Sequence, residues 1–149
     1  MKFLRFTWLF AMLFAVSQLA FAALTKDDAT GLVKKATAAY KANGKEKLVA
    51  DVNTAKGAFD KGELYVFLYD LTGTLVAHPQ KPESVGKNNY QVPDDEGKLF
   101  RKEIIDNAKQ GKSGWVDYKS KNPTTGKLET KSAYYEPVGD LVAVAGIYK

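Results

Sequence analysis

One stretch, residues 62–79, constrains the fold of this chain more than any other. It reads GELYVFLYDLTGTLVAHP, and residues 64–69 are all β-branched, aromatic or aliphatic, the side chains that are enriched in strands. Thr72-Gly73 supplies a turn with a residue that tolerates positive φ. Pro79 removes a backbone donor where the returning strand ends. The stretch therefore predicts a β-hairpin.

Alternation along a strand sorts the hairpin side chains into two faces, and a two-residue or a four-residue loop gives the same sorting. The predicted aliphatic face holds Leu64, Val66, Leu68 and Leu75. The predicted aromatic face, with the only histidine of the chain, holds Tyr65, Phe67, Tyr69, Val76 and His78. Two interpretations stay open. Both faces are buried core, or the aromatic face lines a cavity, because rings with polar tips suit a pocket that orients a polar ligand.

The N-terminus, residues 1–22, has the pattern of a secretory signal peptide. A basic start and an apolar run precede Ala20-Phe21-Ala22, which predicts cleavage before Ala23. The apolar run is short for a membrane span, which needs about 20 residues. An uncleaved anchor that tethers the protein to the inner membrane is the alternative. Residues 23–149 are then one domain, and with no cysteine in the chain export serves no disulfide.

The charge of the chain argues against a nucleic-acid partner. The net charge of +5 belongs partly to residues 1–22, and the remaining basic residues are lysines interspersed with acids, apart from Arg101. Nucleic-acid binders usually concentrate Arg and Lys on one stripe. The lysines are therefore interpreted as a solvated surface.

Three helices are expected. Residues 25–28 form a capping box, apolar residues then recur at helical spacing, and Asn43-Gly44 ends a helix of about 18 residues. A shorter helix is expected at about 46–52. Residues 80–93 form a loop long enough to cover a site. Asp94 is expected to cap a helix from about 95 to 109. The acids at its start lack the alternating ligands of an EF-hand, so no metal site is predicted.

Three more strands follow the last expected helix. They cover residues 114–118, 128–137 and 141–148, separated by Asn-Pro-Thr-Thr-Gly and Gly-Asp turns. Because most strand-to-strand links are short, the sheet is expected to be mainly antiparallel. The fold class is α+β.

Several segments, taken in chain order, resemble the single Cache domain, the extracellular PAS-like sensor module of bacterial chemoreceptors and histidine kinases. They are the hairpin at 62–79, VGKN at 85–88, DEGK at 95–98, SGWVDY at 113–118, KSAY at 131–134 and GIY at 146–148. The resemblance implies a PAS-like fold, with a long N-terminal helix packed on a five-stranded antiparallel sheet and a ligand cavity on the other face. Since the chain ends at Lys149, a free-standing periplasmic version is expected.

Related domains bind small carboxylates such as acetate, propionate, pyruvate or lactate, so the resemblance implies a small organic anion as ligand and no cofactor. A carboxylate needs a cation and a few fixed donors, which Lys, His and Tyr supply. Lys131 and Tyr134 point to opposite faces of a regular strand, so both reach one cavity only if a bulge intervenes. The ligand-binding candidates that the resemblance implies are Tyr65, Phe67, Tyr69, His78, Arg101, Tyr118, Lys131 and Tyr134.

Three functions are compared. The first is a periplasmic sensor module that acts in signal transduction through a membrane-bound sensor kinase, chemoreceptor or transporter. The second is an interaction module that docks on such a partner without a small ligand. The third is an enzyme with His78 as base and Ser132 or Ser113 as nucleophile, but no G-x-S-x-G elbow supports it, so no enzymatic activity is expected.

Overall fold

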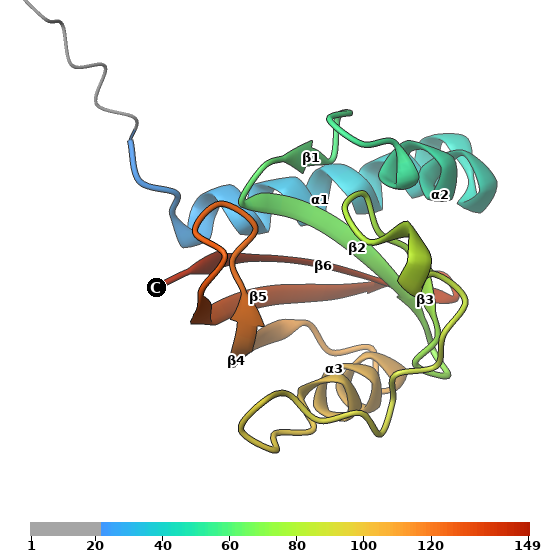
Figure 1. The fold of residues 1–149 in the computed structure, drawn as a ribbon. Coiled ribbons are helices and arrows are strands. Elements are labelled where there is room, and N and C mark those ends of the chain that lie inside the picture. The colour runs from blue at the N-terminus through green and yellow to red at the C-terminus, as the bar shows by residue number, and fades with distance from the viewer. Residues whose placement is uncertain (1–21) are drawn as a thin grey trace, which may run out of the picture.

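The protein is described here by a computed structural model, in which residues 22–149 are placed. The expected signal peptide lies outside the described residues except for Ala22, so its cleavage stays a prediction. In the described part, a central antiparallel sheet separates two layers of helices (Figure 1). Helices α1 (Lys26–Asn43) and α2 (Lys45–Asn53) cover one face, and α3 (Phe100–Lys109) covers the other. The α+β, PAS-like architecture is confirmed.

The sheet contains six strands in the order β1-β2-β6-β5-β4, with β3 paired to β2. Their bounds are β1 Asp60–Lys61, β2 Leu64–Asp70, β3 Leu75–Ala77, β4 Gly114–Lys121, β5 Leu128–Val138 and β6 Leu141–Tyr148. The five expected strands are present. The additional one is the two-residue β1, which pairs with the start of β2. A short 3-10 helix, η1 (Pro82–Ser84), follows β3.

Helix α1 begins and ends where the sequence predicts. The Asp28 backbone N–H donates to Thr25 Oγ1 at 3.3 Å, and the Thr25 N–H donates to the Asp28 carboxylate at 2.7 Å, which completes the capping box. Gly44 ends the helix with φ of +86° and donates its N–H to the Tyr40 carbonyl at 2.8 Å. The buried stripe of α1 packs on the aliphatic side of the sheet and forms one of two cores.

The hairpin forms as predicted, but a β-bulge changes its faces. Leu68 pairs with Ala77 while Tyr69 pairs with Leu75, so the register shifts by one residue between them. The extra residue turns Leu75 into the aromatic core and Val76 toward the aliphatic core. The expected faces of Leu75 and Val76 were therefore wrong. His78 lies beside Tyr65 and Phe67, as the alternation predicted.

Helix α3 begins at Phe100, later than the expected start near residue 95. The Asp94 carboxylate does not cap it. Instead this carboxylate accepts the backbone N–H groups of Glu96 at 3.0 Å and Lys98 at 2.8 Å, and that of Lys119 in β4 at 2.8 Å. A turn fixed to a neighbouring strand thus replaces the first helical turn. Phe100, Ile104 and Ala108 are the buried residues of one row along α3.

Candidate functional site

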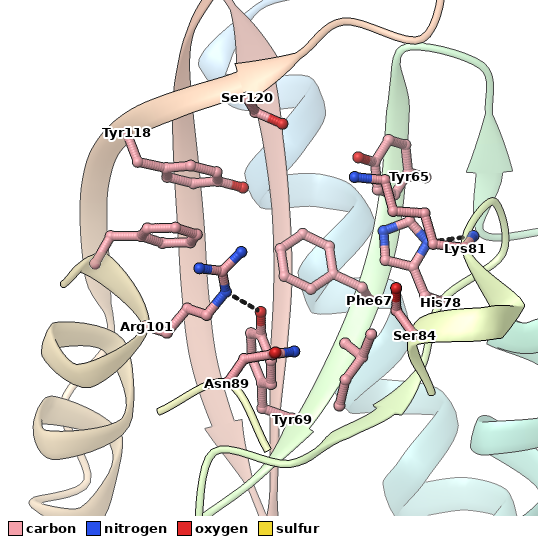
Figure 2. Close-up of a pocket in the computed structure, with 12 residues that line it drawn as sticks. Tyr65, Phe67, Tyr69, His78, Lys81, Ser84, Asn89, Arg101, Tyr118 and Ser120 are labelled. Carbon is pink, nitrogen blue, oxygen red and sulfur yellow. Dashed lines mark hydrogen bonds between the residues drawn. The ribbon is translucent and has the colours of Figure 1, made fainter. Parts of the chain in front are cut away.

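A cavity of about 150 Å³ lies on the aromatic side of the sheet, between β2, the loop after β3 and the start of α3 (Figure 2). Six of the eight predicted residues line it, and these are Tyr65, Phe67, Tyr69, His78, Arg101 and Tyr118. The remaining lining residues are Leu75, Lys81, Ser84, Asn89, Phe100 and Ser120. Within residues 22–149, no aspartate or glutamate lines the cavity. Its wall therefore carries aromatic rings, polar donors and positive charge.

The aromatic wall follows from strand geometry, because alternate residues of β2 point to the same side. The Phe67 ring centroid lies 6.1 Å from that of Tyr65 and 5.6 Å from that of Tyr69. From the α3 and β4 side, Phe100 stacks on Tyr118 with ring centroids 3.6 Å apart and planes within 2°. Burial raises the pKa of Tyr65, Tyr69 and Tyr118. Their hydroxyls therefore stay protonated and can donate hydrogen bonds.

His78 presents a neutral imidazole to the cavity. Its Nδ1 accepts the backbone N–H groups of Gln80 and Lys81, both at 3.1 Å, so the ring proton resides on Nε2. Burial, helped by the charges of Lys81 and Lys131, lowers the pKa of His78 to about 3. The Asn53 side chain also accepts the His78 backbone N–H at 3.0 Å. The loop after β3 thus fixes this ring as a hydrogen-bond donor through Nε2.

Arg101 extends from α3 toward the cavity. Its Nε donates to the Tyr69 hydroxyl at 3.2 Å and its Nη1 to the Val92 carbonyl at 2.9 Å, while the guanidinium lies 4.2 Å from the Phe100 ring centroid. Among residues 22–149, no carboxylate forms an ion pair with it. A guanidinium stays charged at any physiological pH. It therefore offers a fixed positive charge and further N–H donors to an anion.

Lys131 lies behind the cavity wall and does not line it. The side chain is fully buried, and within the described chain its Nζ has no hydrogen-bond partner. This ammonium lies 4.0 Å from the Tyr65 ring centroid and 5.0 Å from that of Tyr148. Burial, with a smaller contribution from the charge of Lys81, lowers the pKa of Lys131 to about 7. Lys131 can thus act on a ligand through its charge, across the ring of Tyr65.

Tyr134 does not reach the cavity, and its prediction as a ligand contact is corrected. The ladders on both sides of β5 run without a register shift, so Lys131 and Tyr134 point to opposite faces. The Tyr134 ring packs near Trp115 with centroids 5.5 Å apart, against the α1 side of the sheet. Its hydroxyl donates to Glu136 at 3.0 Å.

Four polar lining residues were not predicted individually, and these are Lys81, Ser84, Asn89 and Ser120. Ser120 belongs to β4, and the other three come from the loop that was expected to cover a site. Backbone hydrogen bonds hold this loop over the hairpin, from the Gly86 N–H to the Leu75 carbonyl at 2.8 Å and from the Asn89 N–H to the Gly73 carbonyl at 2.9 Å. These tertiary contacts decide which loop side chains face inward. Only the loop length was a signal for them in the sequence.

Ser132 follows Lys131 on a regular strand and pairs with Ile147, which packs on the α1 side, so the sheet separates it from His78. Residues 22–149 contain no group of three or more His, Cys, Asp or Glu side chains placed to hold a metal ion. Within the same range, no helix has the length and apolar character needed to cross a membrane.

Comparisons with known proteins agree with this geometry. The family model described as single Cache domain 2 matches residues 18–144. A methyl-accepting chemotaxis protein from Vibrio parahaemolyticus RIMD 2210633 has a similar structure, with a TM-score of 0.70 at 25% identity, covering 83% of this chain and 87% of that chain. No curated protein matches the chain.

Two further solved structures share the fold. One is described as the periplasmic sensor domain of a chemotaxis protein, with a TM-score of 0.64 at 23% identity and 82% and 88% of the two chains covered. The other is described as a Cache chemosensory domain with carboxylic acid recognition, with a TM-score of 0.63 at 18% identity and 82% and 86% covered. Together with the family match, the layered fold and the cavity, these findings show that the chain belongs to the single Cache domain 2 family.

Proposed function

We propose that this protein is a periplasmic sensor module that binds a small organic anion, a short carboxylate, and acts in signal transduction. The observation that carries the proposal is a cavity lined by Arg101 and Lys81 and, in the part of the chain that the structure describes, by no acidic residue. A positive cavity of this kind favours an anionic ligand. Arg101 is half-buried, and burying a charge is costly unless it is paired, so a bound carboxylate would supply the charged partner that Arg101 lacks among residues 22–149.

The donors around the cavity suit a carboxylate. Arg101 can form charge-assisted hydrogen bonds to both oxygens of a carboxylate, which are among the stronger hydrogen bonds in proteins. The His78 Nε2–H and the protonated Tyr hydroxyls add neutral donors. The rings of Phe67 and Phe100 offer apolar surface to a methyl or ethyl group. A protein with the same fold recognises a carboxylic acid, which supports this ligand class.

The proposed sensing requires a partner that carries the signal across the membrane. The solved relatives include chemotaxis proteins and one periplasmic sensor domain. We therefore propose a membrane-bound chemoreceptor, sensor kinase or transporter as the partner, and a binding role in place of catalysis. Docking on such a partner without a small ligand is the competing function, and the experiment below separates the two.

A thermal-shift screen of the purified protein tests the proposal. Acetate, propionate, pyruvate and lactate are compared with acetamide and propionamide, which have similar shapes but no charge. A ligand at about 100 times its dissociation constant adds about 2.7 kcal/mol to stability, which raises the Tm of a domain of this size by several degrees. We expect a shift with the acids and none with the amides.

Two variants give the screen a control. Arg101→Met should abolish the shift with carboxylates, whereas Lys112→Met removes an exposed lysine and should leave it unchanged. Equal shifts with acids and amides would contradict anion binding. Absence of any shift would favour the docking function, and a pull-down of the membrane partner would follow.

A further inference from the structure

Positive charge lies at both ends of the cavity, with a ring between them. Figure 2 shows Arg101 and Tyr69 on one side of Phe67, and His78 and Lys81 on the other. The Phe67 ring stacks on His78 with centroids 5.6 Å apart and planes 22° apart, and the edge-on Tyr69 ring lies 5.6 Å away on its other side. The cavity is therefore polar at two separate ends and apolar in the middle.

The Arg101 end has donors to spare. Only Nε and Nη1 form hydrogen bonds, to the Tyr69 hydroxyl and the Val92 carbonyl. The remaining guanidinium N–H groups have no partner among residues 22–149. The Tyr69 hydroxyl accepts from Arg101 and keeps its own proton, because burial raises its pKa. This end can hold one carboxylate.

The Lys81 end is also positively charged. The Lys81 backbone N–H donates to His78 Nδ1 at 3.1 Å, which fixes the loop beside the imidazole. The charges of Lys81 and Lys131 both act on His78 and lower its pKa. The charge of Asp60 acts in the opposite direction and raises the pKa of His78. The Asp60 carboxylate already accepts hydrogen bonds from the Lys56 N–H at 2.8 Å and from Gln80 Nε2 at 2.7 Å. Among the described residues, no acidic side chain lines the cavity at this end, so the positive charge of Lys81 has no acidic neighbour in the cavity wall.

We propose that the ligand is a short dicarboxylate, with one carboxylate at Arg101, the other at Lys81 and the Nε2–H of His78, and its methylene spacer across the Phe67 ring. A monocarboxylate would neutralise one end only. The cavity of about 150 Å³ is comparable in volume to an engineered cavity that holds benzene, of about 150 Å³, so the spacer is short, as in malonate or succinate. This inference rests on the proposed function and names its ligand class.

Isothermal titration calorimetry at one pH and one ionic strength tests the inference. Malonate and succinate are compared with succinamate, the monoamide that keeps the shape of succinate but loses one charge, and with butyrate. We expect the better diacid to bind at least about tenfold more tightly than succinamate and butyrate, because only the diacid makes a second charged, hydrogen-bonded contact.

Variants then assign the two ends. Lys81→Met should remove the preference for diacids and lower their affinity to that of the monoacids, whereas Arg101→Met should weaken the binding of diacids and monoacids alike. Lys112→Met is the matched control and should change neither. If succinamate and butyrate bind as tightly as the diacids, the site takes a single carboxylate, so the dicarboxylate inference is overturned while the proposed function stands. If no acid binds, the proposed function itself fails.

Discussion

Lys131→Met tests the electrostatics of the site, because it removes a fully buried ammonium that has no hydrogen-bond partner among the described residues. Methionine keeps an unbranched, flexible side chain that can fill the same space. Burial lowers the pKa of Lys131 from 10.5 to about 7. The folded protein loses this proton near pH 7, while the unfolded chain keeps it up to pH 10.5. The free energy of unfolding of the wild-type protein should therefore rise with pH in this window.

The magnitude follows from the size of the pKa change. One pKa unit corresponds to about 1.4 kcal/mol. Buried Lys131 therefore destabilises the unliganded folded state by about 5 kcal/mol at pH 6, where it is charged, and by about 2 kcal/mol at pH 9, where it must stay neutral while the unfolded chain binds the proton. Lys131→Met should therefore increase the free energy of unfolding, and the increase should be about 3 kcal/mol larger at pH 6 than at pH 9. A stabilising substitution at a binding site fits the trade-off between stability and function.

Urea unfolding followed by circular dichroism at pH 6, 7.5 and 9 measures this effect. Lys34→Met, at an exposed position of α1, is the matched control and should leave the pH dependence unchanged. Equal pH dependence in Lys131→Met and wild type would refute the reasoning, as would a variant that is less stable than wild type at pH 6.

Three further predictions concern the same elements. Burial lowers the pKa of His78 from 6.5 to about 3, so below pH 6.5 the unfolded chain binds a proton that the folded protein does not. The free energy of unfolding should therefore fall by about 3 kcal/mol between pH 6.5 and pH 4. Urea unfolding of His78→Gln should show a smaller fall, and an unchanged fall would assign the effect to other groups. Gly73→Ala should lower the free energy of unfolding by more than about 1 kcal/mol, because φ is +90° and the new Cβ would lie 2.6 Å from the Tyr90 Cβ. Gly62→Ala, at φ +83° but in open space, should lower it less in the same urea-unfolding assay. Equal losses in the two variants would exclude the clash with Tyr90 as the cause. A bound carboxylate should favour the charged form of Lys131 and raise its pKa above about 7. Carboxylate affinity measured by calorimetry should therefore be constant below pH 7 and weaken by up to about tenfold per pH unit above it. Lys131→Met should remove this pH dependence, and a pH-independent affinity in the wild type would contradict an interaction between Lys131 and the ligand.

Local patterns in the sequence predicted the parts of the fold that local forces determine. The capping box at Thr25 and the glycine at 44 set both ends of α1. The alternation in residues 64–69 produced β2 and its aromatic side. The same alternation in β5 placed Lys131 and Tyr134 on opposite faces of the sheet.

Features that depend on tertiary contacts could not be predicted in this way. The start of α3 moved because the Asp94 carboxylate binds the backbone of β4 at Lys119. The bulge in the hairpin exchanged the faces of Leu75 and Val76. Lys81 lines the cavity in place of Lys131 because the loop after β3 closes over the hairpin. None of these contacts has a signal within a short window of sequence.

Carboxylate binding in the cavity between β2, the loop after β3 and α3 is the basis of the proposed function. A titration of the 15N-labelled protein with succinate and propionate, followed by 1H–15N correlation NMR, tests it most directly. We predict saturable shifts centred on the Arg101 Nε–H and on the backbone N–H groups of Gln80 and Lys81, with the α1 stripe around Ala36 unchanged. Saturable shifts centred on residues 61–63, beside another surface pocket, or no saturable shift at all, would contradict binding in this cavity.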